Sequence, residues 1–189
     1  MKFRSGHSKY FIALIPPQPI YDSILEWKNY FKVEFNSKAA LNSPPHITLH
    51  MPFEWKISRE DELFDTMNQF ASQQKSIEVQ LKNFRCFPPR VIYIQVVENN
   101  HLQEMQSTLS RFCKTELNLF NANRLNKPYH PHITVAFRDL KKPVFAKAWN
   151  SVKDLEFSSH FTVRELSLLK HNGKVWEVLP GLSFALNPE

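Results

Sequence analysis

The sequence predicts an α+β fold made of two similar halves. Pro45–Leu49 reads Pro-His-Ile-Thr followed by an aliphatic residue, and Pro131–Val135 repeats this pattern 86 positions later. Each copy lies in a β-favouring run, and the order strand, helix, motif strand, helix, strand occurs twice. No linker or low-complexity tract separates the halves. We therefore expect one domain over residues 1–189 with two pseudo-equivalent lobes, at about 9–87 and 90–180, whose strands line a shared cleft.

Hydrophobic periodicity divides the first half into elements. Continuous or alternating apolar residues indicate strands, whereas apolar residues spaced by three and four indicate helices. Pro16-Pro17 ends the opening strand, and Ser58 followed by Asp61 resembles a capping box that begins the second helix. The expected elements are a strand at 9–15, a helix through 20–31, the first motif strand at 46–51, a helix through 63–70 and a strand at 76–81.

The second half repeats this order after Pro88-Pro89. Its last part adds a hairpin, because Asn172-Gly173 between two apolar runs is a strong turn signal. The expected elements are a strand at 91–97, a helix through 102–112, the second motif strand at 132–137, a short helix beginning near residue 143, a strand at 157–163, and hairpin strands at 164–170 and 174–179.

Composition narrows the functional class. With 42% hydrophobic residues the chain can bury a sizeable core, and its formal charge of +6 favours an anionic partner. Three glycines provide no glycine-rich loop to wrap a triphosphate or a dinucleotide. Cys86 and Cys113 have no metal-ligand spacing, and the apolar run at 10–15 is too short for a signal core or a membrane span. We expect a reduced, cytoplasmic monomer without a cofactor or a membrane segment.

Each motif strand presents its polar residues to one side. Because successive side chains alternate between the two faces of a strand, His46 and Thr48 share one face. His132 and Thr134 share a face in the same way. A single His-x-Thr sequence is usually an ordinary half-buried position. A matched pair in a repeated order of elements indicates a site of two imidazoles and two hydroxyls.

Two imidazoles suit the transfer of two protons at a phosphorus centre. One histidine can take a proton from water or a hydroxyl while the other protonates the leaving oxygen, each transfer contributing about 10²- to 10⁴-fold. In-line displacement places the attacking and leaving oxygens opposite each other, which two pseudo-symmetric strands match. Thr48 and Thr134 can donate to the non-bridging oxygens, so the reaction requires no metal. Either histidine can serve as the base.

The twin motifs resemble those of the 2H phosphoesterase superfamily, which includes 2′-5′ RNA ligase-like proteins and RNA 2′,3′-cyclic phosphodiesterases. Residues 45–53 are similar to the first motif of that branch and 132–135 to the second, and 10–16 and 166–170 are similar to its framework. The resemblance implies a bilobal fold in which two pseudo-symmetric antiparallel sheets line a central cleft, with helices outside. It also implies metal-independent action of the two His-Thr pairs on 2′,3′-cyclic phosphates of nucleotides or RNA ends.

Three further residues are candidates for binding substrate. The family places an aromatic residue shortly after the second motif to stack on a base, and Phe137 matches that position, where a packing role fits equally well. Arg90 and Lys170 could bring positive charge to a phosphate, although a solvated role is commoner for such residues. His50 and His130 lie near the motif histidines and raise zinc as an alternative, but no Asp, Glu or Cys stands at a convincing spacing.

Two other classes of function compete with a metal-free phosphoesterase. A non-catalytic protein that binds RNA ends or nucleotides would keep the same residues and show binding without turnover. A metal-dependent hydrolase would lose its activity with a chelator. Twin-histidine catalysis predicts a bell-shaped dependence of rate on pH, and a flat profile from about pH 5 to 8 would count against it.

Overall fold

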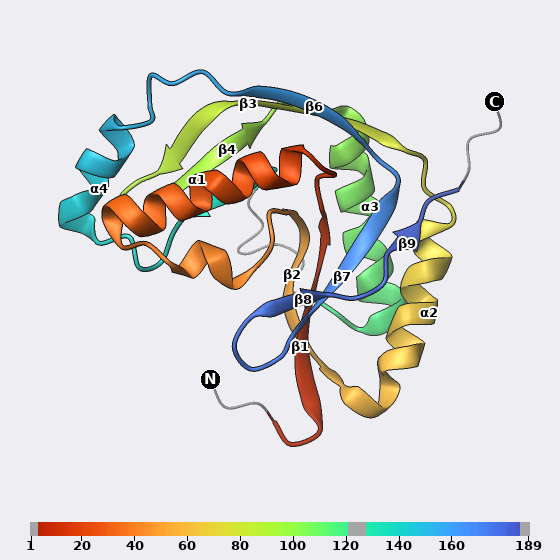
Figure 1. Ribbon diagram of the computed structural model, residues 1–189. Helices are drawn as coiled ribbons and strands as arrows, with labels where there is room; N and C mark the ends of the chain where they lie inside the picture. Colours follow the sequence, from red (N-terminus) through yellow and green to blue (C-terminus); the bar gives the residue numbers. More distant parts are fainter. Residues whose placement is uncertain (1–3, 121–127, 186–189) are drawn as a thin grey trace.

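The computed structural model describes residues 4–120 and 128–185, which alternate strands with helices (Figure 1). The strands are β1 (His7–Leu14), β2 (Ile47–Lys56), β3 (Ile77–Phe87), β4 (Val91–Val96), β5 (His132–Ala136), β6 (Ser158–Val163), β7 (Glu165–His171), β8 (Trp176–Val178) and β9 (Leu182–Ser183). The helices are α1 (Ile20–Phe35), α2 (Glu60–Ala71), α3 (Asn100–Leu117) and α4 (Lys142–Asn150), with 3₁₀ turns η1 (Ala39–Asn42) and η2 (Ile57–Arg59). The predicted order is confirmed from β1 to β8, but β2 and β3 continue well beyond their expected ends, and β9 was not predicted.

The strands form two antiparallel sheets. The first sheet has the order β2-β1-β7-β8, with β9 paired to β7, and the second sheet has the order β5-β4-β3-β6. Helix α1 packs against β5, α3 against β2, and α2 against β7 and β9. Figure 1 shows α1 and α4 beside the second sheet and α2 and α3 beside the first. The predicted α+β fold is confirmed, and no helix in the described ranges is long and apolar enough to cross a membrane.

Each sheet takes strands from both halves of the sequence. Strand β3 belongs to the first half but pairs with β4 and β6 in the second sheet. Strand β7 belongs to the second half but pairs with β1 in the first sheet, and β8 extends it. Because neither half contains a complete sheet, we propose that the chain forms one domain.

The apolar core fixes the two motif strands from behind. Ile47 and Ile133 lie between the histidine and the threonine of each motif, and both are fully buried in the main core cluster. Burial of a side chain of this size is worth about 1.5–3 kcal/mol. The apolar residue of each motif therefore anchors its strand and leaves the histidine and threonine on the opposite face.

The first motif strand contains a bulge that the sequence did not indicate. Strand β1 pairs Ala13 with Thr48 and Ile12 with His50, which leaves Leu49 outside the register. Leu49 and His50 are therefore both buried, and the regular alternation that would place His50 beside His46 is broken. Gln106 of α3 donates from Nε2 to the Leu49 carbonyl oxygen at 3.1 Å. The bulge thus takes a hydrogen bond from outside its own sheet.

Of two local sequence signals, the hairpin turn was predicted correctly and the helix cap was not. The hairpin between β7 and β8 is confirmed, with Gly173 at a φ of 101° and Asn172 Oδ1 accepting from the backbone N–H groups of Lys174 and Val175. The capping box predicted at Ser58 is wrong, because α2 has Arg59 as its N-cap and no side-chain cap. Three acidic residues, Glu60, Asp61 and Glu62, instead fill the first turn, where negative charge is favourable.

We predict that Gln106→Leu lowers the free energy of unfolding by about 1–3 kcal/mol, because it removes a buried donor to the Leu49 carbonyl. Chemical denaturation of the purified variant measures this change. Ser107→Ala, at an exposed position of the same helix, should change stability by no more than about 0.5 kcal/mol. Equal effects of the two substitutions would contradict the assigned role of Gln106.

Candidate active site

The two motifs meet because their strands are the edges of the two sheets. Strands β2 and β5 stand first in the order of each sheet, and they contact each other. The pKa of His46 responds to the charge of His132, so the two imidazoles are electrostatically coupled. Thr48 and Thr134 are half-buried, as are both histidines. The two strands that carry the four residues singled out by the sequence therefore lie against each other.

Both imidazole rings are held in the same way. Nδ1 of His46 lies 2.7 Å from the carbonyl oxygen of Pro44, and Nδ1 of His132 lies 2.7 Å from that of His130. A carbonyl oxygen can only accept a hydrogen bond, so Nδ1 of each ring carries the proton. Nε2 of each ring is consequently the atom that can accept a proton, or donate one once the ring is charged. The backbone two residues upstream thus sets the tautomer of each histidine.

The pKa values of both histidines lie below the ordinary range. Burial is the largest cause for His46, followed by the positive charge of Lys28, and the pKa falls to about 3 although the Pro44 carbonyl opposes the change. Burial is also the largest cause for His132, where the His130 carbonyl raises the pKa and the His130 imidazole lowers it. Both rings are therefore neutral at pH 7 in the free protein. They differ because His46 has a buried cation beside it.

Residues that flank the second motif hold the first motif in place. The segment 37–45, which we call the lead-in segment, joins α1 to β2. The carboxylate of Asp139, just after β5, accepts hydrogen bonds from Ser37 Oγ at 2.9 Å and from the backbone N–H groups of Lys38 and Ala39 at 2.7 and 2.9 Å. Before β5, the Tyr129 hydroxyl donates to the carbonyl oxygen of Thr48 at 2.9 Å. The two motifs are thereby joined on both sides.

An aromatic ring lies against each histidine. On the first sheet, the ring of Phe11 is 4.9 Å from that of His46 and 4.6 Å from that of Trp176, measured between centroids. On the second sheet, His132 contacts the rings of Tyr93 and Phe87 at 5.0 and 5.4 Å. Phe87 and Tyr93 are stacked on each other at 4.5 Å, and Phe87 is 40% exposed. The exposed Phe87 ring offers a flat apolar surface beside His132.

Basic residues of β3 share the face of the second motif. Residues directly paired in an antiparallel sheet point to the same side. Tyr93 pairs with Thr134 and with Arg85, while Gln95 pairs with His132 and with Lys82. Arg85 and Lys82 are both exposed. Positive charge therefore extends from the second motif across the sheet.

Sequence reasoning missed these residues for identifiable reasons. It ended the strand at 76–81 because two consecutive polar residues, Lys82 and Asn83, interrupt the alternation at a register shift, after which the strand continues to Phe87. In β4 the signal was present, because Tyr93 and Gln95 alternate with the buried Ile92 and Ile94. Trp176 reaches the first sheet through the closing hairpin. The sequence around His46 therefore gave no indication that Trp176 lies near the first motif.

The three predicted binding residues lie in different environments. Phe137 is half-buried after β5, with the guanidinium of Arg138 5.2 Å from its ring centre. Arg90 is exposed in the turn between β3 and β4, where its N–H donates to the Phe87 carbonyl at 3.3 Å. Lys170 forms an ion pair with Glu60.

The register shows which way Lys170 points. Lys170 pairs with Tyr10, and its neighbour Leu169 pairs with Phe11, whose ring contacts His46. Adjacent residues of a strand face opposite sides, so Lys170 lies on the face away from His46. We therefore do not include Lys170 among the residues that bind substrate.

The histidines that raised zinc as an alternative do not assemble into a ligand set. His50 is fully buried, with Nδ1 2.8 Å from the Met51 carbonyl oxygen, and its ring forms a T-shaped contact with that of Phe53. His130 is exposed and gives its carbonyl to His132. Over residues 4–120 and 128–185, no group of three or more His, Cys, Asp and Glu side chains is placed to hold a metal ion.

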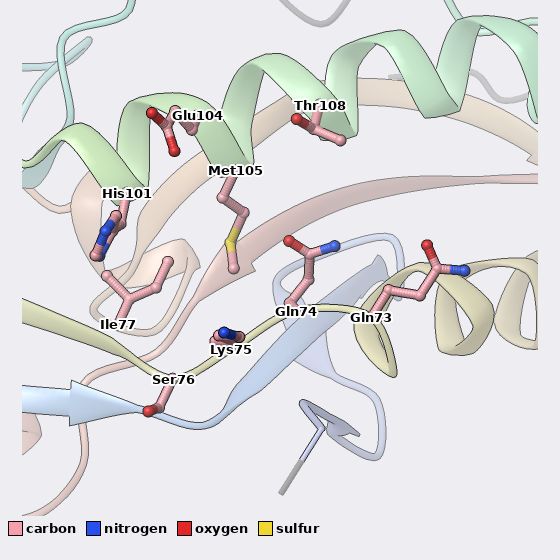
Figure 2. A pocket seen from close by; sticks show the side chains of 9 residues that line it. All are labelled: Gln73, Gln74, Lys75, Ser76, Ile77, His101, Glu104, Met105 and Thr108. Atoms are coloured by element: carbon pink, nitrogen blue, oxygen red, sulfur yellow. The ribbon is translucent and has the colours of Figure 1, made fainter. Parts of the chain in front are cut away.

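A separate hollow of about 390 Å³ lies between the end of α2 and α3 (Figure 2). Figure 2 shows His101 and Met105 of α3 facing Ile77 and the segment that follows α2. None of the nine lining residues belongs to either motif. We assign this hollow no part in the chemistry of the two histidines.

Comparison with known proteins agrees with this arrangement. A sequence model of the 2′-5′ RNA ligase superfamily matches residues 16–175. A protein named as a phosphoesterase in Geobacillus thermodenitrificans (strain NG80-2) is 31% identical over 147 residues, which cover 77% of this chain and 78% of the relative. A similarly named protein of Geobacillus kaustophilus (strain HTA426) is 29% identical over 163 residues, covering 85% of this chain and 87% of the relative.

Solved structures share the fold at low sequence identity. TT0787 of Thermus thermophilus has a TM-score of 0.68 at 20% identity, covering 93% of this chain and 97% of that protein. LigT of E. coli has a TM-score of 0.66 at 19% identity, covering 95% of this chain and 99% of LigT. With paired His-x-Thr strands, two antiparallel sheets and a family match over most of its length, the chain belongs to the 2′-5′ RNA ligase superfamily of 2H phosphoesterases.

Proposed function

We propose that this protein is a metal-independent phosphoesterase that opens 2′,3′-cyclic phosphates of nucleotides or RNA ends. The observation that carries the proposal is the matched orientation of His46 and His132, each bonded through Nδ1 to a backbone carbonyl and each left with Nε2 for proton transfer. The basic residues near the second motif suit an anionic substrate. LigT, which is similar in fold, has been solved with 3′-AMP and with phosphate.

We assign His46 as the base and His132 as the acid of the pair. The buried charge of Lys28 opposes protonation of His46, which favours its neutral form in the free protein. In the proposed step, His46 Nε2 takes a proton from water as the water oxygen forms a bond to phosphorus. The bond from phosphorus to one ribose oxygen breaks, and His132 gives its Nε2 proton to that oxygen. The product is a ribose 2′- or 3′-phosphomonoester.

The substrate's own charge helps the acid. A phosphodiester anion beside His132 favours the imidazolium form and raises its pKa from the value that burial imposes. Thr48 and Thr134 can donate to the non-bridging oxygens as charge develops there. A donor of this kind typically contributes about 2.7–4 kcal/mol to the transition state.

The Phe87 ring is the proposed place for a base. It is exposed, it contacts His132, and it is stacked on Tyr93. A base stacked on such a ring gains about 1–3 kcal/mol. Phe137 remains the candidate that the family resemblance implies, and the two positions can be separated by experiment.

We predict that wild-type protein opens nucleoside 2′,3′-cyclic monophosphates in EDTA and that His46→Ala and His132→Ala each lower kcat by about 10²- to 10⁴-fold. Product phosphomonoesters are separated by chromatography, which also identifies the oxygen that leaves. His101→Ala, an exposed histidine on α3, is the matched control and should keep full activity.

Two results would contradict this function. Tight binding of the cyclic phosphate without turnover would make the protein a binder of phosphate ends. Turnover that appears only when a divalent metal replaces EDTA would make it a metal-dependent hydrolase. A short RNA that ends in a cyclic phosphate, run beside the monophosphates, tests which of the two substrate forms is opened faster.

We predict that kcat/KM follows a bell whose optimum lies below pH 6.5. In the free protein, kcat/KM rises as His46 loses its proton and falls as His132 loses its own, and the pKa of each is below the ordinary value. The optimum of kcat should lie at higher pH, because the bound phosphate raises both pKa values. Both parameters are measured from about pH 4 to 9 at constant ionic strength. A flat kcat/KM profile from about pH 5 to 8 would argue against two titrating histidines.

We predict that Phe87→Ala raises KM for adenosine 2′,3′-cyclic phosphate by about 5- to 150-fold, which corresponds to the loss of one stacked base. The KM for glycerol 1,2-cyclic phosphate, which has no base, should not change. Phe137→Ala is the comparison variant. A loss confined to Phe137→Ala would move the base to that ring.

A further inference from the structure

Lys28 is a buried cation on the apolar stripe of α1. It lies between Ile24 and Phe31 in the row of buried residues of that helix, and it is only 1% exposed. Its Nζ donates to the carbonyl oxygens of Ala40 at 3.0 Å and Ser43 at 2.9 Å. Both acceptors are neutral carbonyl groups, which compensate only part of the cost of burying an ammonium group. An apolar side chain would fill this position of the helix at a lower cost.

The two carbonyls belong to the lead-in segment, which ends just before His46. Ala40 lies within η1, and Ser43 directly precedes Pro44, whose carbonyl accepts the Nδ1 proton of His46 at 2.7 Å. Asp139 holds the other end of the segment at residues 37–39. Lys28 therefore fixes the part of the segment nearest to the imidazole, on the side that Asp139 does not reach.

We propose that Lys28 is the positioning residue of His46, because it ties the backbone on which the imidazole is oriented to helix α1. It acts through Ser43 and Pro44 rather than on the substrate. The placement of His46 by Lys28 can be measured on the protein without substrate. Only the kinetic consequence rests on the proposed function.

Lys28 also gives the site a charge that varies near neutral pH. Burial lowers the pKa of Lys28 to about 7. The neutral amine keeps two N–H groups, so it can still donate to both carbonyls after it loses its charge. Below about pH 7 the ammonium form opposes protonation of His46, which keeps His46 a base in mild acid.

The other charged groups near His46 do not duplicate this effect. His132 on β5 also lowers the pKa of His46, but it stands after Lys28 among the causes. The 3₁₀ turn η1, with the sequence Ala-Ala-Leu-Asn, carries no titratable side chain. Helix α4, which also packs against α1, carries Lys142 and Lys147 on its exposed surface.

The test compares Lys28→Met with Lys32→Met, which makes the same change of charge at an exposed position one turn along α1. Nitrogen NMR of the histidine rings reports the tautomer and the pKa of His46. In Lys28→Met we expect the Nδ1-protonated tautomer to lose its predominance and the pKa of His46 to rise. Lys32→Met should match wild type in both respects.

The kinetic readout follows from the same change. In Lys28→Met, the acid limb of kcat/KM should move to higher pH, and kcat should fall by about 10- to 100-fold because the base is misplaced. Asp139→Asn weakens the other end of the lead-in segment but keeps the charge of Lys28. It should lower kcat while leaving the acid limb where it is in wild type.

The proposal is overturned if folded Lys28→Met keeps the wild-type tautomer and pKa of His46. Should Lys28→Met fail to fold, the wild-type protein provides the test. NMR couplings across the two hydrogen bonds from Lys28 Nζ to the carbonyl groups of Ala40 and Ser43 should then be detected, and their absence would overturn the proposal. A protein inactive on every cyclic phosphate would contradict the proposed function while the NMR result still decides the role of Lys28.

Discussion

The carboxylate of Asp139 is the interaction on which the joining of the two motifs depends. It lies shortly after the second motif strand and accepts three hydrogen bonds from the beginning of the lead-in segment, two of them from backbone N–H groups at the start of η1. Hydrogen bonds to a charged group are worth about 1.5–3 kcal/mol each, and the N-terminus of a helical turn favours a negative charge. A residue that follows one motif strand therefore holds the segment that leads into the other. Tyr129, which precedes the second motif strand, makes another link between the two motifs by donating to the carbonyl oxygen of Thr48.

The polar and apolar faces of the motif strands perform separate tasks. Ile47 and Ile133 bury their side chains completely, and this burial fixes the strands without using any group needed for chemistry. The opposite face is only half-buried, which leaves the histidines open to substrate while still lowering their pKa values. Because β2 is an edge strand, some of its carbonyls have no strand partner. Tyr129 and Gln106 donate to two carbonyls of this strand, at Thr48 and Leu49.

The order of elements and the two His-Thr pairs were predictable because they depend on local patterns. Periodicity identified the four helices α1 to α4 and the strands β1 to β8, though not the short β9, and the Asn172-Gly173 turn needed no tertiary information. The bulge at Leu49 was not predictable, since it shows only in the pairing with β1 and since Gln106, the donor to its carbonyl, lies 57 positions away in the sequence. The role of Lys28 was hidden for a similar reason. Its place on the apolar stripe of α1 was visible, but its acceptors in the lead-in segment were not.

The exchange of strands between the two halves has a consequence for the origin of such a fold. A chain that carried only one half would lack the strand that completes its own sheet, and it could obtain that strand only from a second copy. Two identical copies would then form a symmetric dimer with swapped strands, in which each copy supplied one histidine and one threonine. Joining the copies in a single gene makes assembly of the site independent of protein concentration. It also frees the two histidines to diverge into unlike partners, as the cation beside His46 illustrates.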